Sequence, residues 1–292
     1  MSKEKEHRKF GDRFDGKLIR KIDPMHVICP ILYPNRCDNE AYIAERIDMA
    51  PIRAYLEKIN KEEKDFPYTT FHIIVTAILK TLTLRPKLNR FVANKLMYQR
   101  NKTVASFVVK KLFSDEGEEA LALVEAKPED TMRSIHQKLF EQISVSRSDV
   151  VDKSSESMDI VSKMPRRLTR AFCEFICFLD RIGKCPKGFI ETDPYYTSVV
   201  LSNLGSLHLH SGYHHLTNWG TCSLFCIVGE IKKTSYVKED GMVGVKETID
   251  LGLTVDERLA DGYYCAKSIR LLEKLLANPE LLELPMGEEI EY

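Results

Sequence analysis

The sequence has no excess of either charge, since 43 Lys and Arg residues balance 43 Asp and Glu residues in a chain of 292. A balanced chain gives no electrostatic reason to bind nucleic acid or an anionic membrane, and we expect neither as a partner. No apolar run approaches the ~20 residues that span a bilayer. The opening segment, MSKEKEHRKFGDRFDGK, has no apolar signal region. We therefore expect a cytoplasmic protein.

The cytoplasmic expectation means that the eight cysteines are reduced thiols rather than a disulfide framework. Cys173 and Cys177 lie one helical turn apart among apolar neighbours, and Cys222 and Cys226 share a face of an apparent strand. A metal site at Cys173, Cys177 and Cys185 would need a fourth ligand, which the nearby sequence does not offer. We favour buried small side chains and expect no bound metal.

Apolar stripes at helical spacing predict several helices. The first covers 48–64, with Asp48 as its N-cap and Pro51 in its first turn. The second is capped by Thr69 or Thr70 and stops before Pro86. Further helices are predicted over 130–143, over 158–182 and from Gly262 to the pair Asn278-Pro279.

The segments YTSVVLS (196–202), TCSLFCIVGE (221–230) and LGLTV (251–255) are rich in β-branched and aromatic residues, which predicts strands. The polar segment 144–157 is predicted to be a mobile loop. No composition shift divides the chain. We therefore expect a single α/β domain over 41–292, with helices on one face of a large sheet, preceded by an irregular arm over 1–40.

The order of the segments VVLSNLGS (199–206), CSLFCIVGEIK (222–232), LTVDERLADG (253–262) and LLEKLLANPELL (271–282) resembles a known family. It is similar to the acyltransferase catalytic domain of 2-oxo acid dehydrogenase complexes, which shares its fold with chloramphenicol acetyltransferase. Earlier segments, ERIDMAPIRAYLEKIN and RPKLNRF, are similar to that domain's first helix and to the end of its second. The resemblance covers roughly 40–285.

The resemblance implies a two-layer α/β sandwich with a mixed β-sheet, assembled as trimers or multiples of three. It also implies an active-site channel between neighbouring subunits, which coenzyme A (CoA) enters from one end and the acyl acceptor from the other. Acyl-CoA is then the expected co-substrate, with no permanently bound cofactor. The first 40 residues leave no room for the family's lipoyl domain, so we expect a separate catalytic-type domain.

The family's motif His-x-x-x-Asp-Gly falls on the charged elbow of LTVDERLADG, where Glu257 replaces the histidine, followed by Asp261 and Gly262. The family's histidine is the general base, and a serine of the Ser-Asn-Leu-Gly segment hydrogen-bonds the oxyanion from the adjacent subunit. That serine corresponds to Ser202, although a serine at a strand end is otherwise a turn former. Asn203, Gly205 and Gly262 are expected to line the substrate site.

Glu257 has two interpretations. An ordinary glutamate pKa of about 4.3 makes a weak base toward a thiol of about 8.5, whereas imidazole at about 6.5 fits the chemistry. Burial in an apolar channel, with Asp261 as a neighbouring like charge, would raise the pKa of Glu257 toward the useful range. Alternatively, Glu257 pairs with a basic neighbour and takes no part in catalysis.

The segment SLHLHSGYHHLTNWG (206–220) carries four of the eight histidines. The resemblance implies that it lies at the subunit interface, where His214 or His215 could replace the missing imidazole. Interface packing and metal binding are the alternatives, and His208 and His210 are expected to alternate on one strand-like face.

Asp261 is expected to cap the final helix and to pair with an arginine such as Arg36 or Arg258. Gly262 is expected to permit a close backbone approach. The sequence thus predicts a CoA-dependent acyltransferase that acts on a small thiol, amine or alcohol. The alternative is a catalytically inactive trimeric scaffold or acyl-CoA-binding relative.

Overall fold

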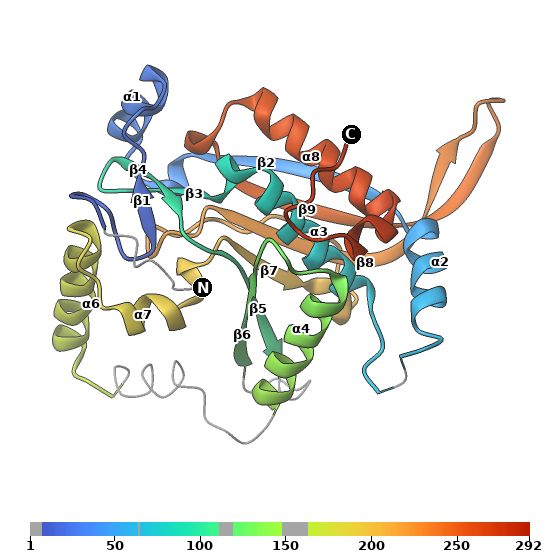
Figure 1. Cartoon of the computed structure of the whole chain (residues 1–292), viewed down its shortest axis with the longest axis horizontal. Helices are drawn as coiled ribbons and strands as arrows, with labels where there is room; N and C mark the ends of the chain where they lie inside the picture. Colours follow the sequence, from blue (N-terminus) through green and yellow to red (C-terminus); the bar gives the residue numbers. More distant parts are fainter. Residues whose placement is uncertain (1–7, 64, 111–118, 148–162) are drawn as a thin grey trace.

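The computed structural model describes residues 8–63, 65–110, 119–147 and 163–292. Its centre is a six-stranded sheet in the order β2-β9-β8-β7-β5-β6 (Figure 1). The strands are β2 (Glu40–Asp48), β5 (Thr103–Lys110), β6 (Glu119–Ala126), β7 (Val199–Asn203), β8 (Leu224–Val237) and β9 (Val243–Asp256). β7 runs parallel to β5 and β8, while the other pairs are antiparallel, so the predicted mixed sheet is confirmed.

Four helices cover one face of this sheet: α2 (Met49–Ile59), α3 (Thr70–Leu84), α4 (Met132–Arg147) and α8 (Gly262–Ala277). The largest buried apolar cluster lies between these helices and the sheet. Strand residues alternate between the two faces, so Val199 and Leu201 join this core while Val200 points to the opposite face. The predicted two-layer α/β architecture is confirmed.

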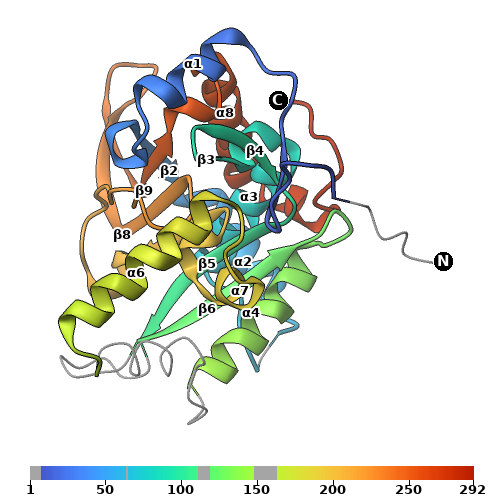
Figure 2. The same ribbon diagram turned by 90° about the vertical axis from the view of Figure 1, so that its left-hand side faces the viewer.

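The opposite face carries a smaller apolar cluster made of Val200, Phe225 and Ile227, which Leu216 covers from the segment after β7. α6 (Arg166–Arg181) and α7 (Lys187–Thr192) lie at the far end of the molecule from the β8–β9 hairpin (Figure 1), and this end faces the viewer in Figure 2. Short 3₁₀ turns are η1 (Arg36–Asp38), η2 (Pro86–Asn89), η3 (Pro194–Tyr196), η4 (Leu204–Leu207), η5 (Glu257–Leu259) and η6 (Pro279–Glu283).

The helix ends follow the sequence signals. The Asp48 side chain accepts a hydrogen bond from the Ala50 N–H at 2.9 Å and so caps α2. α3 begins with a capping box between Thr69 and His72 and ends at Leu84, because Arg85 precedes proline and leaves helical space. α8 stops at Ala277, before Asn278-Pro279.

The prediction of an irregular arm is wrong for residues 8–40, the part of the arm that the structure describes. The arm forms β1 (Gly16–Leu18), which joins β3 (Arg90–Ala93) and β4 (Leu96–Arg100) in a small sheet, and the helix α1 (Pro24–Leu32). Asp23 caps α1 by accepting from the Met25 N–H at 2.9 Å, and Pro24 occupies its first turn, where the missing N–H is not needed. The arm's prolines therefore start a helix rather than prevent one.

Two other boundaries differ. α6 begins at Arg166, after Pro165, while 158–162 of the predicted helix lies outside the described residues. α4 continues to Arg147, so the start of the predicted 144–157 loop is helical, and the rest of that loop is not described. No helix among the described residues is long and apolar enough to cross a membrane.

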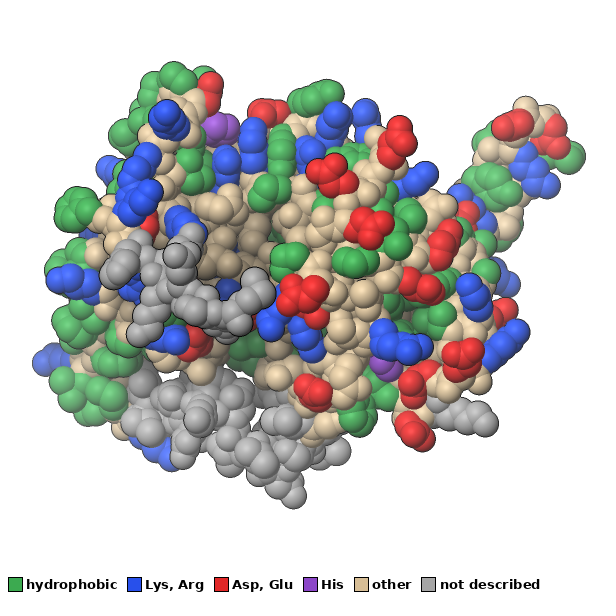
Figure 3. Space-filling view, viewed as in Figure 1, with side chains coloured by type: hydrophobic (Ala, Val, Ile, Leu, Met, Phe, Trp, Pro, Cys, Tyr) green, Lys and Arg blue, Asp and Glu red, His purple; other side chains and the backbone are tan. Residues whose placement is uncertain are grey.

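The eight cysteines are free thiols, with Cys185, Cys222 and Cys226 buried as expected. Cys177 is exposed, which corrects the prediction of burial. It lies on α6, whose apolar stripe of Leu168, Phe172, Phe175 and Phe178 faces solvent in the single chain. Figure 3 shows apolar side chains over this end of the molecule, and acidic and basic side chains intermixed elsewhere.

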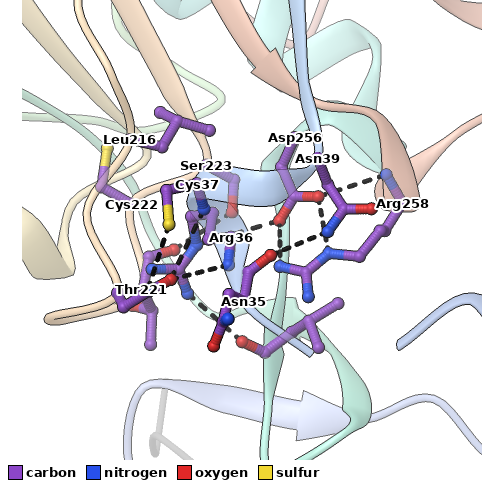
Figure 4. Close-up of polar contacts among 12 residues, drawn as sticks. Asn35, Arg36, Cys37, Asn39, Leu216, Thr221, Cys222, Ser223, Asp256 and Arg258 are labelled. Carbon is purple, nitrogen blue, oxygen red and sulfur yellow. Dashed lines mark hydrogen bonds and ion pairs between the residues drawn. The ribbon is translucent and has the colours of Figure 1, made fainter. Parts of the chain in front are cut away.

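A buried carboxylate joins the arm to the sheet. Asp256, at the end of β9, is fully buried and accepts two hydrogen bonds from the Arg258 guanidinium at 2.8 and 2.7 Å (Figure 4). Arg36 of η1 lies 3.8 Å away on the other side, and burial lowers its pKa. Arg36 also donates to the carbonyls of Thr217 and Gly220. One carboxylate thus holds β9, the arm and the segment 217–220 together.

Asp256→Asn should destabilise the fold by about 3–5 kcal/mol, because it leaves two buried guanidinium groups without their counter-charge. Urea unfolding measures the change. Arg170→Ala is the matched control, since the Arg170–Glu174 pair is exposed and screened by water and is expected to contribute little. Equal losses in both variants would contradict a special role for the buried pair.

Acid should weaken the fold through His72. Burial, together with neighbouring His136, lowers the pKa of His72 to about 3, so the folded chain keeps this imidazole neutral. The unfolded chain takes up the proton near pH 6.5, so the stabilising contribution is complete above that pH and is lost as pH falls toward 3. From pH 7 to 5 this loss is about 2 kcal/mol.

His72→Gln keeps a capping-box residue that does not titrate. We expect urea unfolding to show a loss between pH 7 and pH 5 that is about 2 kcal/mol smaller than in the parent. His215→Gln, at an exposed position, should leave the parent's acid sensitivity unchanged. An acid sensitivity that His72→Gln does not reduce would contradict the assignment.

Candidate active site

A groove of about 1070 Å³ lies between the N-terminal arm, β2, η2–β3 and the start of α8. Its apolar wall includes Ile22, Ile43, Val255 and Ile269. Charged side chains of both signs surround this wall: Lys21, Asp23, Glu45, Lys87, Arg90, Glu257, Asp261, Arg270 and Glu273. All three fixed residues of the Glu-x-x-x-Asp-Gly motif line this groove.

Glu257 begins η5, directly after β9, and lines this groove. Its backbone N–H donates to the Asn39 carbonyl at 3.0 Å, which fixes the elbow against the arm. The side chain is exposed in the single chain and forms no ion pair with the described residues. Neither the burial that a tuned base requires nor the pairing with a basic neighbour is therefore present within one chain.

Asp261 caps α8, as predicted, by accepting from the Tyr264 N–H at 2.8 Å. This hydrogen bond lowers the pKa of Asp261 and keeps the carboxylate charged. The predicted pairing with Arg36 or Arg258 is wrong, because both arginines turn to the buried Asp256. Asp261 is exposed at the groove instead.

Gly262 is the first residue of α8 and lines the groove. A Cβ placed there would meet no atom within 4 Å, so the predicted close backbone approach is not found within one chain.

The arm supplies a histidine that the sequence analysis did not single out. His26 of α1 lines the groove with Glu257 and Asp261, and its Nδ1 lies 3.0 Å from the backbone carbonyl oxygen of Arg258. The Arg258 side chain donates to the carbonyls of Tyr33 and Pro34, at the end of α1. Arg258 thus contacts the arm through both its backbone and its side chain.

A second carboxyl pair lies in the same groove. The Glu45 side chain on β2 is hydrogen-bonded to that of Glu273 on α8, and burial together with this neighbour raises the pKa of Glu45 to about 6. Glu45 therefore takes up a proton at a higher pH than an ordinary glutamate, and the negative charge of the groove falls as the pH drops toward 6.

The other predicted residues lie at the end of β7. Ser202 is half-buried and points to the face opposite the helices, the same face as Val200. Asn203 and Gly205 line a separate hollow of about 460 Å³ with Gly229 and Glu230 of β8. A Cβ at Gly205 would lie 2.4 Å from the Gly229 carbonyl oxygen, so glycine permits a close approach here.

His214 and His215 lie outside the groove, over the second face of the sheet. The His214 ring stacks on Phe225 with centroids 4.1 Å apart, and the His215 ring stacks on His214 at 4.5 Å. The Nδ1 of His214 lies 2.8 Å from the His215 carbonyl oxygen. Within one chain, these two rings therefore pack against each other and against Phe225.

The predicted strand-like alternation of His208 and His210 is wrong. His208 follows η4 with a left-handed φ of 56°, and His210 pairs with Glu230 at 3.1 Å. Across the described ranges, no group of three or more His, Cys, Asp or Glu side chains is arranged to hold a metal ion.

Comparison with known proteins gives one family match. Residues 195–284 match the family described as 2-oxoacid dehydrogenases acyltransferase (catalytic domain). This segment contains the Ser-Asn-Leu-Gly residues, the β8–β9 hairpin, the elbow and α8. No curated protein sequence matches the chain.

Solved structures with the same fold include dihydrolipoamide acetyltransferase of Azotobacter vinelandii, at 14% identity and a TM-score of 0.57 over 92% of this chain and 95% of that one. A probable dihydrolipoamide acetyltransferase from Listeria monocytogenes has 14% identity and a TM-score of 0.56, over 89% and 94%. Chloramphenicol acetyltransferase has 10% identity and a TM-score of 0.56, over 89% and 99%.

At such identities these likenesses establish the fold, while the family match rests on the last third of the chain. The resemblance predicted from the motifs is confirmed at this level: the protein has the chloramphenicol acetyltransferase-like fold, and its residues 195–284 match the family model of the 2-oxoacid dehydrogenases acyltransferase (catalytic domain).

Proposed function

We propose that this protein transfers an acyl group from CoA to a small thiol, amine or alcohol, at a site completed between two subunits. The family match spans both predicted parts of the site, Ser202 on β7 and the elbow at Glu257. The groove at the elbow is open and has an apolar wall, as a thioester substrate requires.

The observation that carries this proposal is the separation of those two parts within one chain. Ser202 pairs with Ile227 of β8, whereas the elbow follows Val255, which pairs with Leu224. Ser202 and Val255 are about 10 Å apart along the strands and about 10 Å across them, and Glu257 lies two residues beyond Val255. A serine that must hydrogen-bond a substrate in the groove therefore has to come from another copy of the chain.

The groove offers contacts suited to acyl-CoA. Ile22, Ile43 and Val255 provide an apolar wall for the pantetheine chain, and Lys87 and Arg90 stand at its edge, where phosphate oxygens could bind. Binding of this kind stabilises the folded chain by mass action.

In the transfer, the acceptor attacks the thioester carbonyl carbon and loses its proton, and the bond from that carbon to the CoA sulfur then breaks. The proton leaves with CoA as its thiol. Negative charge develops on the carbonyl oxygen before that bond breaks, and a hydroxyl placed to donate to it lowers the barrier. We assign that donor to Ser202 of a neighbouring subunit.

Exposure of Glu257 favours a second candidate, an inactive acyl-CoA-binding scaffold, since an exposed carboxylate is a weak base toward a thiol. The two candidates differ in one measurement. Both predict a higher melting temperature with acetyl-CoA or longer acyl-CoAs, but only the transferase consumes the thioester when thiol, amine and alcohol acceptors are added.

Ser202→Ala should lower kcat by about 10²–10³-fold, with little change in KM for acyl-CoA, because the lost hydroxyl contacts the oxyanion rather than the bound substrate. Chromatography of CoA and acyl-CoA measures the rate. Ser206→Ala is the matched control, since this exposed hydroxyl of the same segment donates to the Asn203 carbonyl. Full activity in Ser202→Ala would exclude the assigned donor.

The chain should form a closed trimer or a multiple of three, because the site needs residues from two copies. The exposed apolar side chains of α1 and α6 would then find cover: Val27, Ile28, Ile31, Leu32, Leu168, Phe172, Phe175 and Phe178. Light scattering at micromolar concentration tests the assembly. A stable monomer there would contradict both the trimer and the shared site.

A further inference from the structure

We propose that His26, carried by the N-terminal arm, is the catalytic base that the elbow lacks. This inference rests on the proposed acyl transfer and names the residue that takes the acceptor's proton. The family position for that role holds Glu257, so the imidazole comes instead from α1, a different element that lines the same groove.

The contact at Nδ1 fixes the tautomer of the neutral His26 ring. Nδ1 of His26 lies 3.0 Å from the Arg258 carbonyl oxygen, and a carbonyl can only accept a hydrogen bond. The proton of the neutral ring is therefore on Nδ1. Nε2 keeps its lone pair and can accept a proton, which is the state that a general base requires.

The position of His26 is fixed by contacts at both ends of α1. Asp23 caps α1, and the carbonyls of Tyr33 and Pro34, just beyond its other end, accept hydrogen bonds from Arg258. The same Arg258 is fixed by the buried Asp256. The imidazole is thus held at a residue adjacent to Glu257, by a network anchored in the interior of the fold, as a preorganised site requires.

The other histidines that the structure describes lie outside the groove. Within the part of the chain that the structure describes, His72 and His136 are buried against one another, and His208 and His210 lie outside the groove. His214 and His215 stack over the second face of the sheet. Among the described histidines, His26 is the one that lines the groove with the motif residues.

The surroundings of His26 suit its role. The charged and titratable groups that share the groove come from the arm, β2, the η2–β3 segment, the elbow and α8: Lys21, Asp23, Cys29, Glu45, Lys87, Arg90, Glu257, Asp261, Cys265, Arg270 and Glu273. The carboxylates of Glu257 and Asp261 stabilise the imidazolium that forms when the proton arrives. Glu257 becomes an electrostatic partner of the base rather than the base.

The proton balance is complete. Nε2 of His26 removes the proton from the S–H, N–H or O–H of the acceptor as the acceptor atom bonds to the thioester carbonyl carbon. The carbon–sulfur bond to CoA then breaks, and the imidazolium returns the proton to the departing thiolate. The products are the acylated acceptor and CoA with a free thiol, and no oxidant or metal is consumed.

The experiment compares His26→Ala, His26→Gln and Glu257→Gln in the full-length protein, with Lys238→Ala as a control at an exposed position of the β8–β9 hairpin, outside the groove. Steady-state transfer from acetyl-CoA is followed from pH 5 to 9, with and without added imidazole. Melting temperatures establish that each variant is folded.

Both His26 variants should lose about 10²–10⁴-fold in kcat with KM for acetyl-CoA nearly unchanged, and imidazole should restore part of the rate of His26→Ala alone. They should also lose the pH dependence of the rate that the parent shows. Glu257→Gln should stay within about tenfold of the parent, since it removes only a partner charge.

The outcomes separate the two proposals. An active parent whose His26→Ala variant keeps its rate and pH profile overturns the assignment of His26 and leaves the transferase intact. A loss in His26→Ala that imidazole does not rescue, with an altered KM, means that the residue only shapes the groove, which also overturns the assignment. A folded parent that transfers no acyl group to any acceptor overturns both proposals.

Discussion

The buried carboxylate of Asp256 is the interaction on which the geometry of the groove depends. It meets the guanidinium groups of Arg258 and Arg36, both nearly inaccessible to water. Burying such charges costs several kcal/mol per ion unless each is paired and hydrogen-bonded. The remaining Arg36 and Arg258 donors meet backbone carbonyls of β3, of the arm and of the segment 217–220. Pieces of chain that are distant in sequence therefore keep one relative position.

The Asp256–Arg258 pair also determines the direction in which Glu257 points. Since Arg258 and Asp256 point into the interior, Glu257 between them faces the opposite way, toward the groove and solvent. α8 then starts at Gly262 with Asp261 as its cap, and the arm contacts the elbow through His26, whose Nδ1 lies 3.0 Å from the Arg258 carbonyl oxygen. The groove thus depends on side chains that alternate in direction at the end of β9, with Asp256 and Arg258 pointing inward and Glu257 pointing outward. Its chemistry is set by what the arm contributes.

Much of this arrangement could be predicted from the sequence. Asp48, Thr69 and Pro86 mark helix ends by local hydrogen bonding and sterics, and β8 and β9 follow from runs of β-branched residues, so these elements needed no tertiary information. The motif residues Ser202 and Glu257 were found by resemblance, and the fold it implies is confirmed. Local signals were sufficient wherever the stabilising contacts were also local.

The missed features all depend on contacts between distant segments. Arg36 and Arg258 were assigned to Asp261 because the motif drew attention to it, while Asp256 reads in sequence as an ordinary strand end. α1 was missed because Pro24 and Pro30 suggest an irregular segment, and His26 has no motif around it. Its position becomes visible only when Arg258, over two hundred residues later, accepts its hydrogen bond.

The depth of the Asp256 pair has a consequence for ionic strength. Mobile ions screen exposed charges over about 8 Å in physiological salt, but they do not reach a carboxylate with no accessible surface. Lys21 and Arg270 at the groove are exposed and are screened fully. Added salt should therefore weaken the attraction between these two side chains and an anionic ligand while the positions of the elbow and the arm stay the same. The shape of the groove should not change with salt, because it depends on the buried Asp256. The affinity for an anionic ligand should change, because it depends on exposed side chains.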